Sequence, residues 1–559
     1  MRMTGAEMVV RLLEANGATH VFGIPGGSVI PLYDAFSDAR FTHLLMRHEQ
    51  AAVHAADGFA RVSGRPGVCV CTSGPGFTNC LTGLATAFAD SVPLVLVCGQ
   101  VATSLIGTDA FQEADVFGGS LSVVKHSFMV RDLAGLARTF RSAFGIAGEG
   151  RPGPVLIEIP VDLQREVGDL PSGTTDGECP VRVSGRGGAT PELREALRLL
   201  DAAERPMFLA GGGVMISRAS EALLSCAERF QAPVATTLLG KGSFPGSHPL
   251  SLGMAGMHGT PQANLALSEA DVILAVGTRF SDRTTGNTGF FGKAAAVIHI
   301  DIDASEIGKV VAPSLGIVAD AGDALRFLNE CPGRRRDPSW VARTREWRAR
   351  YAAPGMMQGG FHPGDIVRRI RNAFDDVVPL VADVGQNQMW AAQHWSAEHP
   401  GTFLTSGGLG TMGYALPAAV GASFAAGLSP VVCVAGDGGF LMNVQELDTC
   451  VRYAVPIRIF ILNNGCLGMV RQWQELFRDG RYSQTVTGSP CDYVRLAGAF
   501  GIPGFLCSSL EGLDSVLSEV ASVEGPVLVE CRIAQEENVF PMVPPGGALG
   551  DFLLRAGDV

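Results

Sequence analysis

The chain has 559 residues, of which 47% are hydrophobic and 18% are charged, and its formal net charge is −12. This length is too great for one hydrophobic core and predicts about three or four domains, while the composition excludes a disordered chain. The negative charge argues against nonspecific binding to nucleic acid or to anionic membranes.

The chain opens on a predicted amphipathic helix within residues 1–17, with Met8, Val9, Leu12 and Leu13 on one face. This segment lacks the apolar stretch and cleavage site of a signal peptide, and no later apolar run is long enough to span a bilayer. The 13 cysteines are scattered through apolar strands without a CxxC pair, which indicates buried thiols and not a disulfide framework or a zinc site. We therefore expect a protein of the cytoplasm.

Apolar strand-like runs alternate with helical stretches along the rest of the chain. In order they are VCVCTS, LVLVCGQ, VLIEIP, MFLAGGG, VILAVG, VIHIDID, VVCVAG, IRIFILNN and VLVECRI. Strands that are apolar on both faces and separated by helices predict doubly wound α/β domains with parallel sheets. Gly- and Pro-rich stretches near 165–190 and 331–360 predict linkers between three such domains, at 1–165, 190–330 and 360–559. The last domain ends in PMVPPGGALGDF, for which we expect an irregular strap.

Two successive strands of the third domain end in polar residues. VVCVAG runs into Asp437 between Gly436 and Gly438, and the next strand ends in an Asn pair that closes with Asn464. Carboxyl ends of parallel strands are where ligands bind, and the Asp437 carboxylate and Asn464 amide suit Mg²⁺, with a backbone carbonyl near Cys466 as a third ligand. Because Mg²⁺ fills its octahedron with phosphate oxygens, the set predicts a metal-anchored diphosphate that the glycines let approach closely. A lone Gly-Asp-Gly is more often a turn.

This pair of strand ends is identified as the diphosphate motif of thiamine-diphosphate-dependent enzymes. The resemblance runs from end to end and is greatest to the catalytic subunits of acetolactate (acetohydroxyacid) synthases. Its segments are GQVATSLIGTDAFQEAD, GRPGPVLIEIPVD, LGMAGMHGT, VGTRFSDRTTG, HIDIDASEIGK, SGGLGTMGYALPAA, LGMVRQWQELF and EENVFPMVPPG. It implies a pyrimidine-binding, an FAD-binding and a diphosphate-binding domain, in that order. The implied reaction decarboxylates pyruvate and ligates the two-carbon unit to pyruvate or 2-ketobutyrate, as in branched-chain amino acid biosynthesis.

The resemblance also assigns roles to residues around the reacting centre. Glu49, which alone would be a carboxylate at a helix start, becomes the group that activates the cofactor pyrimidine. Gly27 and Gln112 line the reacting centre, the Gly410 carbonyl accepts a hydrogen bond from the pyrimidine amine, and Met412 wedges the cofactor into its bent conformation. The implied substrate contacts are Phe111, Arg283, Met469 and Trp473. Of these, Arg283 matches a 2-keto acid carboxylate, and Trp473 distinguishes a methyl from an ethyl group.

The middle domain is expected to hold FAD. A bare GGG after a strand is only a weak indication of a dinucleotide site. The FAD contacts that the resemblance implies are Arg151, Gly211, Gly212, His258, Arg279, Asp301 and Asp320. Pyrimidine and diphosphate domains of this family meet across a subunit interface, so we expect a homodimer or tetramer in which Glu49 of one chain serves the cofactor of the other. A regulatory small subunit is a further partner that the resemblance leaves open.

Two residues depart from the family pattern. Val161 stands where the family usually has a lysine along the substrate channel, and Ser28 stands where it usually has alanine. Both leave the cofactor anchors intact and bear on the acceptor, because the lysine would attract keto acid anions. Three alternatives follow: a carboligase with another acceptor, a 2-keto acid decarboxylase or FAD-coupled pyruvate oxidase, and an inactive homologue. Intact Glu49, Gln112 and Asp437 count against the last.

Overall fold

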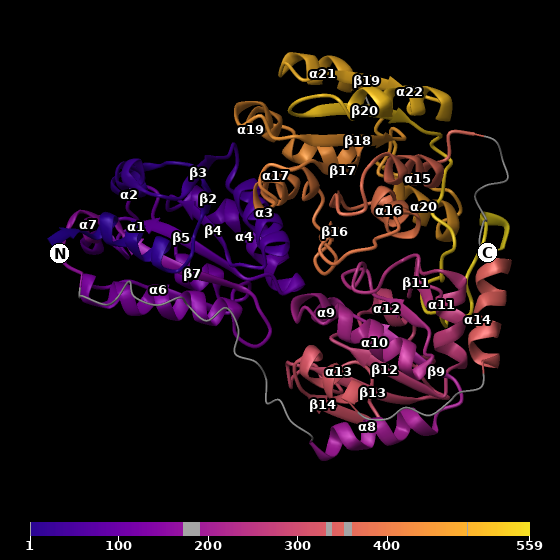
Figure 1. Cartoon of the computed structure of the whole chain (residues 1–559). Coiled ribbons are helices and arrows are strands. Elements are labelled where there is room, and N and C mark those ends of the chain that lie inside the picture. Colours follow the sequence, from indigo (N-terminus) through magenta and orange to yellow (C-terminus); the bar gives the residue numbers. More distant parts are fainter. Residues whose placement is uncertain (1, 171–189, 331–337, 352–359, 489, 559) are drawn as a thin grey trace.

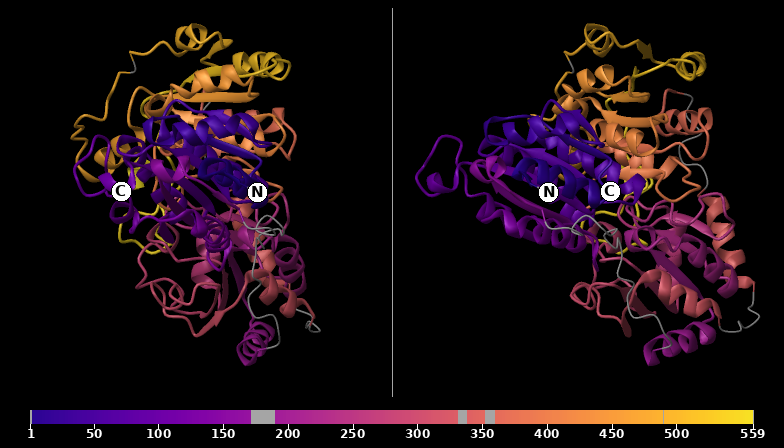
Figure 2. Two further views of the ribbon diagram at one scale, coloured as in Figure 1. Left: turned by 90° about the vertical axis from the view of Figure 1, so that its left-hand side faces the viewer. Right: turned by 60° about the vertical axis from the view of Figure 1, so that its left-hand side comes forward.

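The computed structural model describes residues 2–170, 190–330, 338–351, 360–488 and 490–558. They include three six-stranded parallel sheets, with helices on both faces of each sheet (Figure 1). The prediction of three doubly wound α/β domains is therefore confirmed. Figures 1 and 2 show the middle domain stacked against the C-terminal domain, with the N-terminal domain against them from the side.

The N-terminal sheet has the strand order β3-β2-β4-β5-β7-β6, and all neighbouring strands run parallel. Its strands are β2 (His20–Gly23), β3 (Thr42–Leu45), β4 (Gly67–Cys71), β5 (Leu94–Gln100), β6 (His126–Met129) and β7 (Pro154–Pro160). Its main helices are α1 (Gly5–Ala15) and α6 (Leu133–Gly148) on one face, and α3 (Glu49–Ser63) and α4 (Pro75–Asp90) on the other. Because both faces are covered, β4 and β5 are buried throughout, which explains their unbroken apolar sequences.

The middle sheet has the order β11-β10-β9-β12-β13-β14, again parallel. Its strands are β9 (Pro206–Ala210), β10 (Val234–Thr236), β11 (Ser251–Met254), β12 (Val272–Val276), β13 (Ala296–Asp301) and β14 (Leu315–Val318). One face packs on α8 (Pro191–Ala202), α10 (Ser220–Phe230) and α13 (Ala321–Glu330), and the other on α11 (Pro261–Glu269) and α14 (Ser339–Arg350). Two short helices, α9 (Gly212–Ile216) and α12 (Asp282–Thr285), follow strands β9 and β12.

The C-terminal sheet has the order β16-β15-β17-β18-β20-β19 and is also parallel. Its strands are β15 (Leu380–Ala382), β16 (Phe403–Thr405), β17 (Val431–Gly436), β18 (Ile457–Asn463), β19 (Gly504–Cys507) and β20 (Val527–Arg532). Its helices are α17 (Ala415–Ala425), α18 (Asp437–Phe440), α19 (Glu446–Arg452) and α21 (Tyr493–Ala499) toward one face, and α15 (Pro363–Ala373), α16 (Gln386–His394), α20 (Gly468–Phe477) and α22 (Leu510–Val520) toward the other.

Helices α3 and α17 join the N- and C-terminal domains. They cross so closely that a Cβ on Gly58 would overlap the carbonyl oxygen of Ala418, and a Cβ on Gly421 would overlap that of Ala55. One buried apolar cluster runs through both domains, whereas most of the middle domain is built around two separate clusters. The N- and C-terminal domains therefore share a hydrophobic core although the middle domain separates them in sequence.

Helix α14 lies inside the predicted linker at 331–360, so that prediction was wrong for residues 339–350. Trp340 is buried against the middle sheet, and its indole N–H donates to the carbonyl oxygen of Pro206 at 3.0 Å. Most of this helix is polar and rich in arginine, and its buried stripe is narrow, with Trp340, Val341 and Thr344. The polar composition is why the sequence suggested a linker.

Strand β8 (Val167–Asp169) lies inside the predicted linker at 165–190 and pairs antiparallel with β1 (Arg2–Thr4), so that prediction was wrong for these residues too. Residues 171–189, 331–337 and 352–359 of the two predicted linkers lie outside the described residues.

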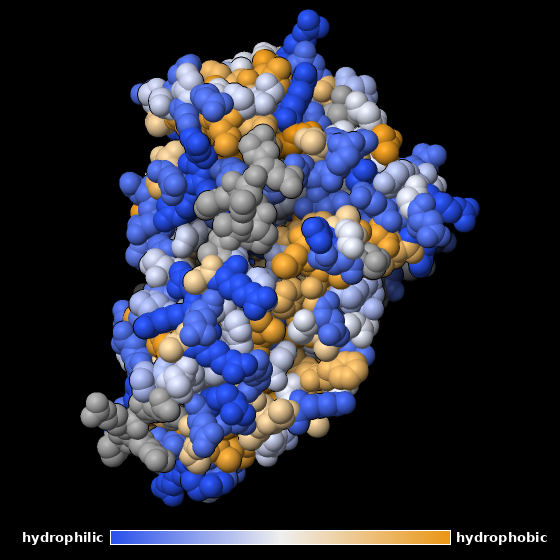
Figure 3. Space-filling view, turned by 90° about the vertical axis from the view of Figure 1, so that its right-hand side faces the viewer, coloured by the Kyte–Doolittle hydropathy of each residue, from blue (hydrophilic) through white to orange (hydrophobic). Residues whose placement is uncertain are grey.

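The C-terminal segment leaves β20 and runs from the C-terminal domain onto the middle domain (Figure 1). The Val543 amide donates to the carbonyl oxygen of Met257 at 2.7 Å, and the Asn287 amide donates to that of Gly547 at 3.1 Å. Figure 3 views the side on which this segment ends in Figure 1, and apolar residues gather in the middle of that face. None of the described helices combines the length and apolar character needed to cross a bilayer.

Candidate active site

A cavity of about 1330 Å³ lies where the three domains meet. It is lined by the end of α4, by strand ends of the middle sheet, and by the loops that follow β15, β16, β17 and β18. The carboxyl ends of these parallel strands open into it, as expected for ligand sites in open α/β sheets. Its volume exceeds the roughly 300–1,000 Å³ of a pocket for one drug-sized ligand, so it can hold more than one small molecule.

Asp437 and Asn464 occupy adjacent strand ends in this cavity. Asp437 begins α18 directly after β17, and only 3% of its surface is exposed. Burial raises the pKa of its carboxyl to about 6, and nearby backbone N–H groups act in the opposite direction. The Asn464 side chain donates to Gln386 Oε1 at 3.0 Å and accepts from the Cys466 amide at 3.2 Å. The carboxylate and the amide oxygen are thus held in place at one edge of the sheet.

These residues fit a divalent cation with a diphosphate. A buried carboxylate is costly without a cation, and no Lys, Arg or His of the described chain forms an ion pair with Asp437. Gly438 leaves space that a side chain would fill, since its Cβ would lie 2.9 Å from Leu467 Cδ2. Hard oxygen ligands with open positions suit Mg²⁺, which completes its shell with phosphate oxygens. Cys466 also lines the cavity, as a backbone ligand requires.

Gly410 and Met412 lie in the loop between β16 and α17, and both line the cavity. Gly410 has φ 75°, a conformation that favours glycine. Asp383, at the end of β15, fixes the far end of this loop: its carboxylate accepts from the Gly413 amide at 3.0 Å and the Ala415 amide at 2.9 Å.

Arg283 and Trp473 form one wall of the cavity. The guanidinium of Arg283, on α12, lies 5.6 Å from the centre of the Trp473 ring, on α20. The Arg283 side chain is 61% exposed, and one of its N–H groups donates to the sulfur of Met257 at 3.5 Å. Met469, one turn before Trp473, also lines the cavity. An open guanidinium beside an aromatic wall can take a carboxylate whose short side chain faces the ring.

The middle-domain end of the cavity carries acids and arginines that fit a dinucleotide. Burial raises the pKa of the Asp301 carboxyl to about 6, and this carboxylate accepts from the Asp303 amide at 3.0 Å. Arg151 donates to Glu306 at 2.9 Å, and Arg279 lies in the same wall. Acids at strand ends suit ribose hydroxyls, and arginines suit phosphates. His258 Nδ1 is buried without a hydrogen-bond partner among the described residues, so a polar ligand atom can satisfy it.

Gly212 and Asp320 also line the cavity, whereas Gly211 does not. A Cβ on Gly211 would overlap the carbonyl oxygen of Gly277, so this glycine allows the turn after β9 to pack against the end of β12. Asp320 accepts from Ser217 Oγ at 2.6 Å and from the Gly322 amide at 2.9 Å, which joins the end of β14 to α9 and α13.

Glu49 and its predicted neighbours lie elsewhere, at the edge of the N-terminal sheet. Glu49 begins α3 and accepts from Asn79 Nδ2 at 2.9 Å. Gln112, with φ 60°, lies beside Gly27, whose Cβ would be 3.9 Å from Gln112 Oε1. Phe111 is 89% exposed. None of these four predicted residues lines the large cavity of the same chain.

Sequence reasoning missed several cavity residues. Gln386 and Asn387, at the start of α16, accompany Asn464 at the diphosphate end. A signal for them existed, because VADVGQNQ places polar residues after a third strand of the same sheet. Asp90 and Ser91, at the end of α4, carried no such signal, since their place in the cavity depends on how the domains dock.

Comparison with known proteins agrees with this geometry. Models of the thiamine pyrophosphate enzyme N-terminal TPP binding, central and C-terminal TPP binding domains match residues 3–118, 193–328 and 383–531. The probable acetolactate synthase large subunit of Methanocaldococcus jannaschii is 45% identical, over 99% of this chain and 95% of its own length. The acetolactate synthase isozyme 2 large subunit of Escherichia coli is 43% identical, over 99% of both chains. The acetolactate synthase large subunit of Parasynechococcus marenigrum is also 43% identical, over 97% of this chain and 90% of its own length.

A buried acid and an amide lie on two adjacent strand ends of the C-terminal sheet. Three parallel-sheet domains around a shared cavity, with strand ends of the middle and C-terminal sheets opening into it, are the architecture of a thiamine-diphosphate-dependent enzyme. Within that class the chain belongs to the acetolactate synthase large-subunit family.

Proposed function

We propose that this chain is an acetolactate synthase that decarboxylates pyruvate and joins the two-carbon unit to a second 2-keto acid. The observation that carries this proposal is the single cavity that contains both Asp437 with Asn464 and Arg283 with Trp473. A cofactor anchor and a carboxylate-binding wall in one space are what a two-substrate ligation needs, because both substrates must reach the same reacting atom.

Thiamine diphosphate, held through Mg²⁺, is the cofactor that this site would take, and when bound it supplies a carbon nucleophile and an electron sink for decarboxylation. Asp437, Asn464 and the carbonyl near Cys466 would hold the metal. The Gly410 carbonyl would accept a hydrogen bond from the pyrimidine amine, and Met412 would wedge the cofactor into its bent conformation. Glu49 would hold the proton that moves to and from the pyrimidine ring nitrogen.

Arg283 would bind the carboxylate of the second keto acid through a fork of two N–H groups. Trp473 and Met469 would enclose its side chain. Apolar contacts with these two residues would therefore determine the selectivity between pyruvate and 2-ketobutyrate. One methylene in such a pocket is worth about 1–3 kcal/mol. Val161 lies at the start of helix α7 (Val161–Arg165) and brings no cation to the channel, which leaves attraction of the keto acid to Arg283.

FAD is the second cofactor that we propose. Asp301 and Gly212, which line the cavity, would contact the adenosine end, and Arg151 and Arg279 would contact the phosphates. His258 lies in the cavity wall near Arg283, whose charge joins burial in lowering the pKa of the imidazole to about 4. A neutral imidazole there can donate or accept one hydrogen bond to a ring of the cofactor.

A homodimer or tetramer would complete the site. Glu49, Gly27 and Gln112 lie outside the chain's own cavity, so a second chain is needed to bring such a group to Asp437. Exposed apolar residues surround this half of the site on the N-terminal domain, and others lie beside the cavity loops of the C-terminal domain. The first group includes Ile30, Leu105, Phe111, Phe117 and Leu121, and the second Leu409, Leu441 and Met442. Apolar patches of this kind mark protein interfaces.

The relatives are named large subunits, so we also propose a small regulatory subunit as a partner. The reducing cytoplasm is the proposed compartment, because the described cysteines are free thiols and nearly all are buried.

Product analysis tests the proposed function. The chain is incubated with pyruvate, thiamine diphosphate, Mg²⁺ and FAD, with and without 2-ketobutyrate, and products are separated and weighed by mass spectrometry. We expect 2-acetolactate alone in the first case and added 2-aceto-2-hydroxybutyrate in the second. Acetaldehyde or acetate as the sole product would instead indicate a decarboxylase or an oxidase and would overturn the proposal.

A further inference from the structure

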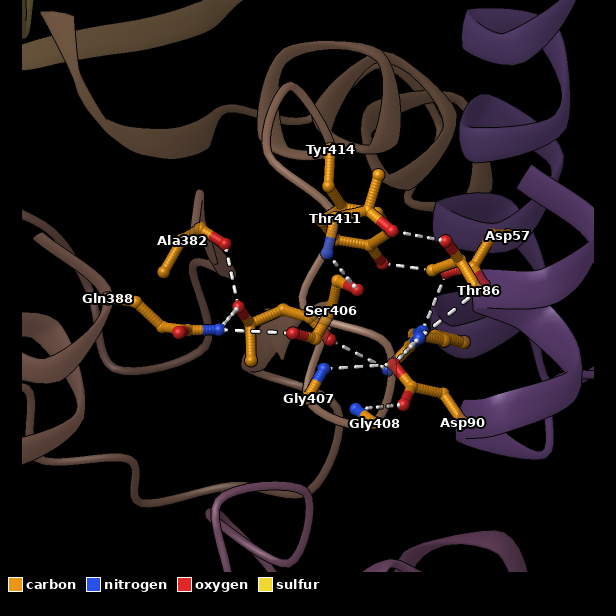
Figure 4. Close-up of polar contacts among 12 residues, drawn as sticks. Asp57, Thr86, Asp90, Ala382, Gln388, Ser406, Gly407, Gly408, Thr411 and Tyr414 are labelled. Carbon is orange, nitrogen blue, oxygen red and sulfur yellow. Dashed lines mark hydrogen bonds and ion pairs between the residues drawn. The ribbon is translucent and has the colours of Figure 1, made fainter. Parts of the chain in front are cut away.

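A buried polar network ties the N-terminal domain to the loop that carries Gly410 and Met412 (Figure 4). Its centre is Arg61 on α3, which donates to Asp57 Oδ1 at 2.7 Å and to Asp90 Oδ2 at 2.8 Å. The side chains of Asp57 and Asp90 are fully buried, and that of Arg61 is 16% exposed. Charges taken this far from water persist only where partners satisfy them, so the geometry of this triad is fixed.

The Asp90 carboxylate holds the near end of the loop. It accepts from the Gly407 amide at 3.1 Å and from the Gly408 amide at 2.6 Å. Arg61 adds a bond to the carbonyl oxygen of Thr405 at 3.2 Å. A Cβ on Gly408 would lie 2.6 Å from Asp90 Oδ1 and 2.9 Å from the Ala89 carbonyl oxygen, so the loop touches the end of α4 at a position that accepts only glycine.

Two further contacts hold the loop beyond Gly410. Thr86, one turn before Asp90 on α4, makes a hydroxyl–hydroxyl bond of 2.7 Å with Thr411. Tyr414 donates from its hydroxyl to Asp57 Oδ1 at 2.6 Å. The N-terminal domain therefore holds the loop before Gly410 and again around Met412, and both of these residues line the cavity.

We propose that Asp90, held by Arg61, is a positioning residue for the cofactor loop: it sets the course of residues 406–412 before any cofactor binds. Within the loop's own domain, Asp383 holds the far end, and the Gln388 side chain donates to the Ser406 carbonyl oxygen at 3.1 Å at the near end. The amides of Gly407 and Gly408, between these anchors, donate to Asp90. With the Asp90 bonds lost, Gly410 and Met412 would sample several positions, and cofactor binding would have to order them. This inference rests on the proposed function, because it assigns the loop to the thiamine cofactor.

Two variants perturb this contact by different means. Asp90→Asn keeps the shape but removes one acceptor and the charge, and Arg61 keeps Asp57 as its partner. Gly408→Ala keeps the charges and pushes the loop off α4. Glu446→Gln is the matched control, because Glu446 is a buried acid at the same domain boundary that accepts from the Arg47 amide at 3.0 Å and does not touch the loop.

The first measurement is hydrogen exchange of the full chain without cofactor. We expect faster exchange at Gly407, Gly408 and Thr411 in both loop variants, and wild-type exchange there in Glu446→Gln. The second is the Kd for thiamine diphosphate with Mg²⁺, measured by calorimetry without substrate. Each lost charge-assisted hydrogen bond should weaken binding about tenfold, and the control should bind like wild type.

Wild-type exchange and wild-type Kd in Asp90→Asn would overturn the inference alone. Equal loosening of the loop in Glu446→Gln would also overturn it, because the loop would then respond to any loss at the domain boundary. Failure of the unaltered chain to bind thiamine diphosphate would instead overturn the proposed function, and this inference with it. Should Gly408→Ala not fold, Asp90→Asn decides the outcome by itself.

Discussion

The two halves of the thiamine site differ in how complete they are within one chain. At the C-terminal half, Asp437 and Asn464 are buried at strand ends inside a large cavity. At the N-terminal half, Glu49 and Gln112 lie outside that cavity, and Phe111 beside them is 89% exposed. Under the proposed function, the metal and diphosphate anchor would therefore lie within one folded chain, and the activating group would come from a second chain.

The largest effect is expected at the buried half. Asp437→Ala removes the carboxylate that we propose as a ligand of the metal, so we expect loss of cofactor binding and a fall in acetolactate formation of about a thousandfold or more. Calorimetry with thiamine diphosphate and Mg²⁺ measures the first, and product assay the second. Asp514→Ala, at an exposed acid on α22 that does not line the cavity, is the control. Normal cofactor affinity in Asp437→Ala would remove this residue from the anchor.

Glu49→Gln should separate binding from activation. The amide keeps the size of the side chain but cannot take up a proton, so activity should fall about 10²–10³-fold while cofactor affinity stays near that of wild type. Affinity is measured as above and activity by product assay. An equal loss of affinity would show that Glu49 acts in binding, and the contrast between the two halves would be lost.

Mixing the two inactive chains tests the second-chain requirement directly. A dimer of one Asp437→Ala chain and one Glu49→Gln chain has one intact site, because each chain supplies the half that the other lacks. After random exchange of subunits, half the dimers are mixed, so activity should return to about a quarter of wild type. Co-expression with two affinity tags isolates the mixed dimers. If these remain inactive, both halves of the site belong to one chain.

Trp473→Leu should change selectivity more than rate. Removal of the aromatic wall beside Arg283 should lower the preference between 2-ketobutyrate and pyruvate about tenfold, as measured by product ratio in mixed substrate. Phe477→Leu is the matched control, because Phe477 lies one turn along α20 with its ring 5.6 Å from that of Trp473 and does not line the cavity. An unaltered ratio in Trp473→Leu would place acceptor choice elsewhere.

The smallest effect concerns the hydrogen bond between the Arg47 amide and Glu446, which links the N- and C-terminal domains within a chain. Burial raises the pKa of the Glu446 carboxyl to about 7 from 4.5. The folded chain therefore binds this proton more tightly than the unfolded chain does. Its contribution to the free energy of unfolding is fully present below about pH 4.5 and is lost as the pH rises through 7. Glu446→Gln should make the free energy of unfolding depend less on pH. Relative to wild type, the variant should be about 1–3 kcal/mol more stable at pH 8 than it is at pH 5. Chemical unfolding of the cofactor-free wild type and variant at both pH values measures these free energies. The same difference between pH 5 and pH 8 in both chains would contradict the prediction.

Much of the fold could be predicted from local sequence. Strands buried on both faces, such as β4 and β18, are apolar throughout, and their alternation with helices defines parallel sheets. Asp437 and Asn464 could be found because polar residues at successive strand ends meet at one edge of a sheet.

What escaped prediction depends on docking between distant segments. Asp90 ends a helix without any local mark, and only the approach of the 406–412 loop gives it a role. Trp340 lies among arginines that suggest a solvated linker, and its contact with the middle sheet turns that stretch into helix. Gly211 was placed in the FAD site by sequence, yet its lack of a side chain serves packing against Gly277.

The crossing of α3 and α17 also has a consequence for synthesis. About 350 residues separate the end of α3 from the start of α17, which at roughly 5–20 residues per second takes about 20–70 s of translation. Throughout that interval the emerging N-terminal domain lacks the helix that covers α3, and the small-residue face around Gly58 stays open to other nascent chains. This surface is covered only once α17 has been synthesised, about three quarters of the way along the chain.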